Sequence, residues 1–181
     1  MKLEMQALET IAKTREYLDY VEDHINNVSR AWEEVMAATQ GNGDFPINYD
    51  DYRYHTLCGE VAAHDLSKLS PEEFVQYRLM FYPTEAEKKE STPQGFDEAW
   101  KHHWKNNHHH WEKWTTTNYY GPYEEEIHCT HMVIDWLAMS YRFGDTPREY
   151  YEKNKDKIEL PEWAVKYIYQ LFDSLEENKK L

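Results

Sequence analysis

The pattern of apolar side chains between residues 4 and 38 constrains the fold more than any other feature of the sequence. Spacings of three, four and seven residues place side chains on one face of an α-helix. Two such rows run through this segment: Ile11, Leu18, Ile25 and Trp32 form one, and Val21, Val28 and Val35 form the other. We therefore predict one long amphipathic helix over residues 4–38, which covers a core built by the rest of the chain.

The remaining apolar patterns also predict helices, and no series of alternating strands separates them, so we expect an all-α fold. The expected helices cover residues 52–69, 96–106 and 123–143, and a last helix follows Leu160-Pro161. TTTNYYGPY, at residues 115–123, is rich enough in Thr and Tyr to allow a short extended segment.

Two short sequences have the form of a capping box, in which a Ser or Thr N-cap is followed three residues later by Glu. In SPEEF, Ser70 is the expected N-cap, Pro71 the first helical residue and Glu73 the third. TPRE, at residues 146–149, repeats the pattern. A capping role explains Glu73 without catalysis.

The chain length and the absence of repeats predict one domain. The 181 residues are enough to bury a sizeable core, and no low-complexity linker divides them, so we expect a single helical domain over residues 1–181. The two glycines and the proline of QGNGDFP, residues 40–46, end the first helix.

The charge balance restricts the partners. Lys plus Arg total 20 and Asp plus Glu total 34, which gives a net charge of −14. An acidic protein is poorly suited to coating a nucleic-acid polymer or an anionic membrane. A small phosphorylated substrate is still compatible, because a bound divalent metal reverses the local field.

No segment predicts export or membrane insertion. The first twenty residues contain charges every few positions, and nothing later approaches 18 consecutive apolar residues. Cys58 and Cys129 stand apart without a CxxC pair, as expected of reduced thiols. We expect a cytoplasmic protein, of a bacterium or of a phage-infected host cell.

Several residues on the predicted helices are of the types that bind metals. In HDLSK, His64 and Asp65 offer a neutral nitrogen and an anionic oxygen to one cation. Lys68 could hold a phosphate oxygen, although an Asp65–Lys68 ion pair on a solvated helix face explains the same spacing. His24 lies at the edge of the apolar stripe, where a histidine is either a hydrogen-bonded core residue or a ligand.

Asp135 is flanked by apolar residues in HMVIDWLAM, so its helix is expected to be buried. A buried carboxylate needs a cation or several hydrogen-bond donors. His128 and His131 precede Asp135 by seven and four residues and share its helical face. They could be further ligands or only its hydrogen-bond partners.

HHWKNNHHHWEKW, at residues 102–114, places five of the ten histidines within nine positions. A metal site, a phosphate-binding or proton-transfer surface, and an idle polar surface are the possible explanations. An imidazole with a pKa of about 6.5 is mostly neutral at pH 7 and can ligate. Four tryptophans are expected to pack this segment against the core or, as an alternative, to stack on a base: Trp100, Trp104, Trp111 and Trp114.

Helical periodicity does not choose between the histidines of this cluster. In a continuous helix two sets would each share a face, namely His102 with His109, and His103 with Asn107 and His110. The two consecutive asparagines in the middle are expected to interrupt the helix, which leaves both sets open.

Taken in chain order, these residues resemble the HD superfamily of metal-dependent phosphohydrolases. HDLSKLSPEEFVQY, AWKHHWKNNHHHWEKW, Asp135-Trp136 and EYYEKNKDKIEL are similar to motifs of a small HD-like family of phages and gut bacteria. The resemblance spans the chain from His24 to about Leu160. There are two departures: residues 39–54 look like an inserted loop, and His108 stands in place of a proline.

The resemblance implies an HD-like helical bundle with one or two divalent metal ions, drawn from Mn, Fe, Co, Ni, Zn and Mg. The ligands that it implies for the first ion are His24, His64, Asp65 and Asp135. A second ion would be bridged by Asp65 and bound by cluster histidines. His103 and His109 are the candidates for this role, and His102 and His110 are the alternates.

The function that follows is a metal-dependent phosphohydrolase acting on a nucleotide or another small phosphate ester. Its catalytic residues would be Asp65, Lys68, His103 and His109. Asn107 and His110, with Lys68, would contact the substrate. Two alternatives stay open: a di-iron HD-type oxygenase, and a non-catalytic phage or bacterial interaction protein that a metal only stabilises.

Overall fold

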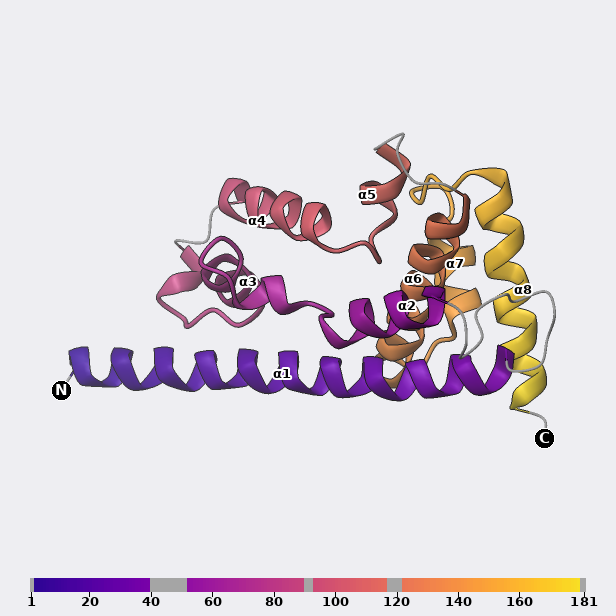
Figure 1. The fold of residues 1–181 in the computed structure, drawn as a ribbon. Coiled ribbons are helices and arrows are strands. Elements are labelled where there is room, and N and C mark those ends of the chain that lie inside the picture. The colour runs from indigo at the N-terminus through magenta and orange to yellow at the C-terminus, as the bar shows by residue number, and fades with distance from the viewer. Residues whose placement is uncertain (1, 40–51, 90–92, 117–121, 180–181) are drawn as a thin grey trace. The chain divides into compact units, whose positions relative to one another are not determined.

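The computed structural model describes residues 2–39, 52–89, 93–116 and 122–179, and the regular secondary structure in these ranges is entirely helical (Figure 1). This confirms the predicted all-α class. The elements are α1 (Lys2–Thr39), α2 (Tyr52–Ala62), η1 (Leu66–Leu69), α3 (Phe74–Phe81), η2 (Glu87–Lys89), α4 (Pro93–Asn106), α5 (Trp111–Thr116), α6 (Pro122–Phe143), α7 (Pro147–Asn154) and α8 (Glu162–Asn178). No helix among the described residues is both long and apolar enough to span a membrane.

The chain divides into two compact units. Unit 1 contains the chain up to Ile25 together with Asp65–Asn106, and unit 2 contains Asn26–His64 together with the chain from Asn107 onward. The chain passes from one unit to the other within α1, between His64 and Asp65, and at the end of α4. The assignment of one domain over residues 1–181 stays a prediction.

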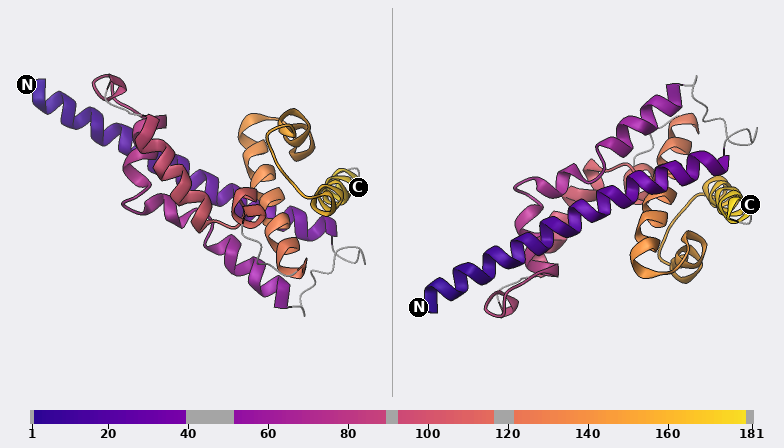
Figure 2. Two further views of the ribbon diagram at one scale, coloured as in Figure 1. Left: turned by 90° about the horizontal axis from the view of Figure 1, so that it is seen from above. Right: turned by 90° about the horizontal axis from the view of Figure 1, so that it is seen from below.

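Helix α1 is the long amphipathic helix that the sequence predicts, and it is unbroken in both views of Figure 2. Its buried stripe consists of Tyr17, Val21, His24, Val28, Ala31 and Val35. The valine row is therefore correct. The other predicted row is displaced toward solvent, since Ile11 and Leu18 are 48% and 41% exposed. Tyr17, His24 and Ala31 also recur every seven residues, but their weaker apolar character hid this row.

Unit 2 is built around α6, which packs against α2, α5, α7 and α8. Apolar side chains cover most of the α6 surface, and Ile134 and Leu137 are fully buried. From α8, Ile168 and Phe172 join the same core. A helix that is apolar on most sides belongs in the centre of a bundle, which explains the position of α6.

Unit 1 has a smaller apolar core, formed where α3 and α4 pack together. Its buried apolar members are Tyr17, Val21, Tyr77 and Ala99. The same unit buries several charged or imidazole side chains, among them His24, Asp65, Lys68, Glu73, Arg78 and His103. Buried charges must be paired, so hydrogen-bonded ion pairs organise this unit. Arg78, for example, donates both of its terminal amino groups to Glu87.

The predicted second helix ends earlier than expected, and HDLSK lies outside it. Helix α2 stops at Ala62, and the backbone then tightens into a turn in which the His64 N–H bonds the Val61 carbonyl oxygen at 3.1 Å. Asp65 has a φ of 59°, in the left-handed region. Asp adopts this region more readily than most residues because its short side chain bonds locally. The placement of HDLSK inside the second helix was therefore wrong, and its last three residues belong to η1 instead.

The two predicted capping boxes have different outcomes. At α7 the box is confirmed, because Thr146 Oγ1 accepts the Glu149 N–H and the Glu149 carboxylate accepts the Thr146 N–H. The box at SPEEF was wrong. Helix α3 begins only at Phe74, and Glu73 makes no capping bond. Its carboxylate instead binds two histidines of α4.

Two predicted loop segments lie mostly outside the described residues. Residues 40–51 of the expected insertion 39–54 are not described, and those on either side are helical. An extended segment was allowed at residues 115–123. Residues 117–121 of this stretch are not described, and residues 115, 116, 122 and 123 are helical. Pro161 precedes α8 as predicted.

Candidate metal centres

Three histidines form a buried group in unit 2. His64, His109 and His131 each offer a ring nitrogen, and these atoms lie within 4.8 Å of one another. His64 Nδ1 is 3.0 Å from His131 Nε2, and the His64 ring stacks on His109 with centroids 4.2 Å apart. All three side chains are at most 3% exposed. Nitrogen donors at this spacing could hold a divalent transition-metal ion.

Asp135 adds an anionic oxygen to this group. Its Oδ1 lies 3.5 Å from His64 Nε2, and its side chain is 17% exposed. His131 precedes Asp135 by one turn of α6, so both side chains leave the same face of that helix. The sequence identified this shared face. Among the residues that the resemblance implies, the structure thus brings together His64, His109 and Asp135.

Local structure positions His109. Helix α4 ends at Asn106 and α5 begins at Trp111, so the consecutive asparagines do interrupt the helix. His109 lies in the connection between the two helices, where its ring contacts His131 and His110. Asn107 is buried and His110 is half-buried in the same connection. Trp111 packs against the core of unit 2 and fixes the end of this segment.

Glu60 on α2 faces three further imidazole nitrogens in unit 2. Its carboxylate oxygens lie 3.4 Å from His108 Nδ1, 3.2 Å from His128 Nδ1 and 3.4 Å from His131 Nδ1. Burial alone would raise the pKa of Glu60, but hydrogen bonds from these three imidazoles hold it well below its usual value. Glu60 is therefore a carboxylate anion in the folded protein.

Sequence reasoning missed Glu60, and it did not single out His108 as a ligand. His128 and His131 were considered as further ligands beside Asp135 or as its hydrogen-bond partners, and not as neighbours of Glu60. The nearest local signal is that Glu60 precedes His64 by four residues on the same predicted helix. That helix ends at Ala62, so the spacing alone would have given the wrong geometry.

In unit 1, Asp65 lies between two imidazoles. Its Oδ2 is 3.3 Å from His24 Nε2, and its Oδ1 is 3.3 Å from His103 Nε2. Lys68 Nζ donates to the same carboxylate and is only 8% exposed. The structure therefore brings together four of the predicted site residues: His24, Asp65, Lys68 and His103. The left-handed backbone of Asp65 is the kind of strained conformation that is found at functional sites.

Aromatic rings enclose Lys68. Its ammonium lies 5.9 Å from the centre of the Tyr20 ring and 5.8 Å from that of Tyr77, and the Tyr17 hydroxyl donates to its backbone carbonyl. Tyr77 also contacts His103. These rings stabilise a buried cation and exclude water from the Asp65–Lys68 pair.

Glu73 orients the two histidines at the end of α4. Its carboxylate oxygens lie 2.7 Å from His102 Nδ1 and 2.8 Å from His103 Nδ1, which are hydrogen-bond distances. Burial alone would raise the pKa of Glu73, but these bonds hold it below its usual value. Burial likewise opposes the charged form of His103, yet Asp65 and Glu73 raise its pKa.

The tryptophans have separate positions. Trp100 packs against the apolar core of unit 1 and stacks on His103, with ring centroids 5.8 Å apart. Trp104 is half-buried, and Lys105 Nζ lies 5.7 Å from the centre of its ring. The Trp114 side chain lies outside the described residues. Packing against the core is thus observed for Trp100 and, in unit 2, for Trp111.

The four ligands that the resemblance implies for one ion are distributed over both units. His24 and Asp65 belong to unit 1, and His64 and Asp135 belong to unit 2. Their convergence on a single ion stays a prediction.

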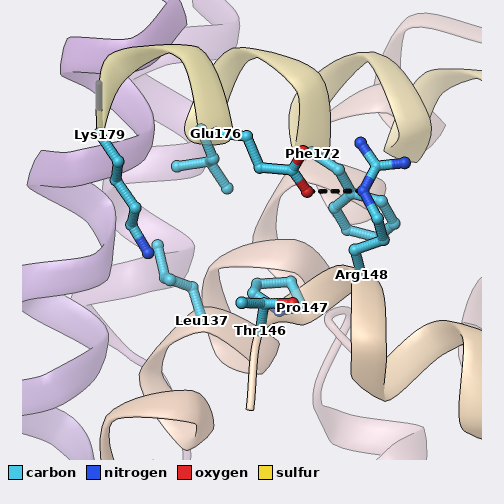
Figure 3. Close-up of a pocket in the computed structure, with 8 residues that line it drawn as sticks. Leu137, Thr146, Pro147, Arg148, Phe172, Glu176 and Lys179 are labelled. Atoms are coloured by element: carbon cyan, nitrogen blue, oxygen red, sulfur yellow. Dashed lines mark hydrogen bonds and ion pairs between the residues drawn. The ribbon is translucent and has the colours of Figure 1, made fainter. Parts of the chain in front are cut away.

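A surface pocket in unit 2 has a different character. It lies at the junction of α6, α7 and α8, as Figure 3 shows, and it is lined by Leu137, Thr146, Pro147, Arg148, Phe172, Leu175, Glu176 and Lys179. Arg148 Nε donates to Glu176 at 2.6 Å, and a second nitrogen donates to Asp173. The guanidinium thus connects α7 to α8, and histidine is missing from the lining residues.

Comparison with known proteins gives a family but no activity. A family model described as a family of unknown function (DUF5662) matches residues 13–179. A search of curated proteins and a search of solved structures returned no match.

Proposed function

We propose that this chain, which belongs to the DUF5662 family of unknown function, is a metal-dependent phosphohydrolase acting on a nucleotide or another small phosphate ester. One observation supports this most directly. Three buried imidazoles meet in unit 2 beside the partly exposed carboxylate of Asp135. The reaction class follows from the resemblance of HDLSK and its companion motifs to HD phosphohydrolases.

The donor set fits a transition-metal ion. Three neutral nitrogens and one carboxylate oxygen suit Mn, Fe, Co, Ni or Zn, whereas Ca and Mg are bound mainly through oxygen. Most of the donors lie within buried surroundings, and Asp135 at 17% exposure leaves an approach from solvent. Catalytic sites combine protein ligands with such an open position.

The chemistry required of the metal is limited. A bound divalent ion lowers the pKa of a coordinated water toward neutrality and withdraws electrons from a phosphoryl oxygen. His64, His109 and His131 would hold it through ring nitrogens, and Asp135 would offset part of its charge.

Unit 1, taken by itself, contains side chains of the types that bind phosphate. Lys68 is assigned to a phosphoryl oxygen because an ammonium group can donate to several oxygen acceptors, and Asp65 is one acceptor in the structure. His103 would add a second donor at Nε2, while Glu73 fixes its ring through Nδ1. Donors that are held in place before the reaction stabilise the charge that develops on phosphoryl oxygens. Asp65 keeps both donors in position.

The experiment combines metal analysis with an activity screen. Chain without a polyhistidine tag is purified, its metals are measured, and phosphate release is tested over nucleotides and simple phosphate esters with each candidate ion. We expect bound transition metal and phosphate release, with His109→Ala losing both.

His55→Ala is the matched control, because His55 is exposed on α2. It should retain both metal binding and turnover. If the wild-type chain binds metal but releases no phosphate with any ion or ester, the phosphohydrolase proposal is wrong. If His109→Ala and the wild type bind metal equally, the metal site is wrong.

A further inference from the structure

A second group of metal-binding side chains lies in unit 2, and the proposed phosphohydrolase site does not use it. Glu60, His108 and His128 each place a ligand atom within 4.8 Å of the others. The two histidine rings stack nearly parallel, with centroids 4.5 Å apart and an interplanar angle of 23°. Both Nδ1 atoms face the same carboxylate.

The distances in this group also suit coordination of one ion, although Glu60 and His128 already form a hydrogen bond of 3.2 Å. Bonds of about 2.0 to 2.1 Å in a tetrahedral arrangement separate neighbouring ligand atoms by about 3.3 Å. The separations of Glu60 from His108 Nδ1 and His128 Nδ1 are 3.4 and 3.2 Å. The Glu73–histidine contacts in unit 1 are 2.7 and 2.8 Å, which is the range of charge-assisted hydrogen bonds.

The elements hold this group in place without a metal. Helices α2 and α6 pack directly together, which sets Glu60 against His128. His128 is 5% exposed, whereas the side chains of Glu60 and His108 are 18% and 34% exposed. One buried ligand and two accessible ones give an ion a route to the group from solvent.

We propose that Glu60, His108 and His128 form a second metal site, which binds a borderline divalent ion such as Zn²⁺ or Co²⁺. Two nitrogen donors and one oxygen donor exclude a preference for Ca²⁺ and favour ions that accept imidazole. Three protein ligands leave a fourth position for water.

His131 connects the two sites of unit 2. Its Nδ1 faces Glu60 Oε2 at 3.4 Å, and its Nε2 faces His64 Nδ1 at 3.0 Å. Substitution of Glu60 or His131 would therefore disturb both sites. His108 belongs to the second group and His109 to the first, so substitutions of these two residues address the two sites separately.

The test is the number of ions bound per chain. Metal-free protein is dialysed against Zn²⁺, bound zinc is measured, and Co²⁺ absorption in the visible region reports the coordination. We expect His108→Ala and His109→Ala each to bind one ion fewer than the wild type. The double variant should bind two fewer. This outcome does not depend on phosphate release, so it stands or fails separately from the proposed activity.

His55→Ala serves as the control and should bind as the wild type does. Circular dichroism checks that each variant is folded, and His108→Gln replaces His108→Ala if the latter does not fold. If the folded His108 variant binds the same number of ions with the same affinity as the wild type, Glu60, His108 and His128 are only a hydrogen-bonded network and the proposal is overturned.

Discussion

The two units of this chain are stabilised in different ways. The described part of unit 2 contains twenty buried apolar residues in one cluster, whereas that of unit 1 contains four. Unit 1 instead buries Asp65, Lys68, Glu73, Arg78 and His103. Buried ion pairs contribute less net stability than apolar packing of the same volume. We therefore expect unit 2 to supply most of the folding free energy, whereas many buried positions of unit 1 are occupied by charged side chains.

Two glutamates extend the comparison to the sites. Glu73 in unit 1 is fully buried and bonds two histidines at hydrogen-bond distances. Glu60 in unit 2 is partly exposed and faces three imidazoles at 3.2 to 3.4 Å. The same residue types thus give an orienting contact in one unit and a spacing suited to an ion in the other.

The largest expected effect is in the core of unit 2. Phe172→Ala removes a ring that is 1% exposed and packs against Tyr151 and Tyr169. We expect the free energy of unfolding to fall by about 3 to 5 kcal/mol, because the ring leaves a cavity. Urea denaturation measures this loss. A loss below about 1 kcal/mol would show that the apolar cluster is not the main source of stability.

The second prediction separates the two glutamates. With EDTA present, Glu73→Ala should lower the free energy of unfolding by about 2 to 3 kcal/mol, because two buried charge-assisted bonds are lost. Glu60→Ala should cost less under the same conditions, since its contacts are longer and partly exposed. Thermal unfolding in EDTA measures both.

In the presence of zinc, Glu60→Ala should lose more unfolding free energy than Glu73→Ala, relative to the wild type. An ion bound only by the folded chain adds about 2.7 kcal/mol when its concentration is 100 times the dissociation constant. The wild type and Glu73→Ala should gain this stabilisation from the second site, and Glu60→Ala should not. If the two variants lose the same unfolding free energy in EDTA and gain the same amount on addition of zinc, the proposed difference between Glu60 and Glu73 is wrong.

The third prediction concerns an ion pair in unit 1 away from the histidines. Hydrogen bonds from Arg78 lower the pKa of Glu87 from 4.5 to about 2. Because the folded-state pKa is the lower one, the stabilisation is complete above pH 4.5 and is lost as the pH falls toward 2. Glu87→Gln should cost about 1 kcal/mol at pH 7, given its partial exposure.

The measurement is urea denaturation of both proteins between pH 7 and pH 3. The difference between wild type and Glu87→Gln should be constant down to about pH 5 and should shrink below pH 4.5. A difference that grows on acidification would contradict the assigned direction of the pKa shift.

Much of the fold could be predicted because helical periodicity is a local property. The valine row of α1 gives the buried face, and Pro161 marks the start of α8. The end of α2 could not be predicted in this way. Asp65 turns the backbone into the left-handed region, where its carboxylate meets His24 and His103, and these two contacts are not local in sequence.

The sequence predicted many of the residues of the candidate sites, but it did not predict all of the contacts between them. His24, Asp65 and His103 meet within unit 1, although the first and the last are 79 positions apart (103 − 24). Glu60 was missed because the contact between α2 and α6 that brings it to His128 is not recorded in any local pattern. Glu73 was misread because its tertiary partners compete with the cap that its spacing predicts.

The smallest expected effect tests that last point, because the two capping sequences form a matched pair. Thr146 Oγ1 in unit 2 accepts the Glu149 N–H, so Thr146→Ala should lower the free energy of unfolding by about 1 kcal/mol. Ser70 Oγ in unit 1 is buried and makes no hydrogen bond, so Ser70→Ala should change stability by less than about 0.5 kcal/mol. Both residues precede a Pro, Ser70→Ala removes a hydroxyl and Thr146→Ala removes a hydroxyl and a methyl group, and urea denaturation at pH 7 compares the two changes. If Ser70→Ala cost as much as Thr146→Ala, Ser70 would be capping α3 in solution. The Glu73 carboxylate would then complete that cap instead of accepting hydrogen bonds from His102 and His103. The proposed difference between Glu73 and Glu60 would no longer hold.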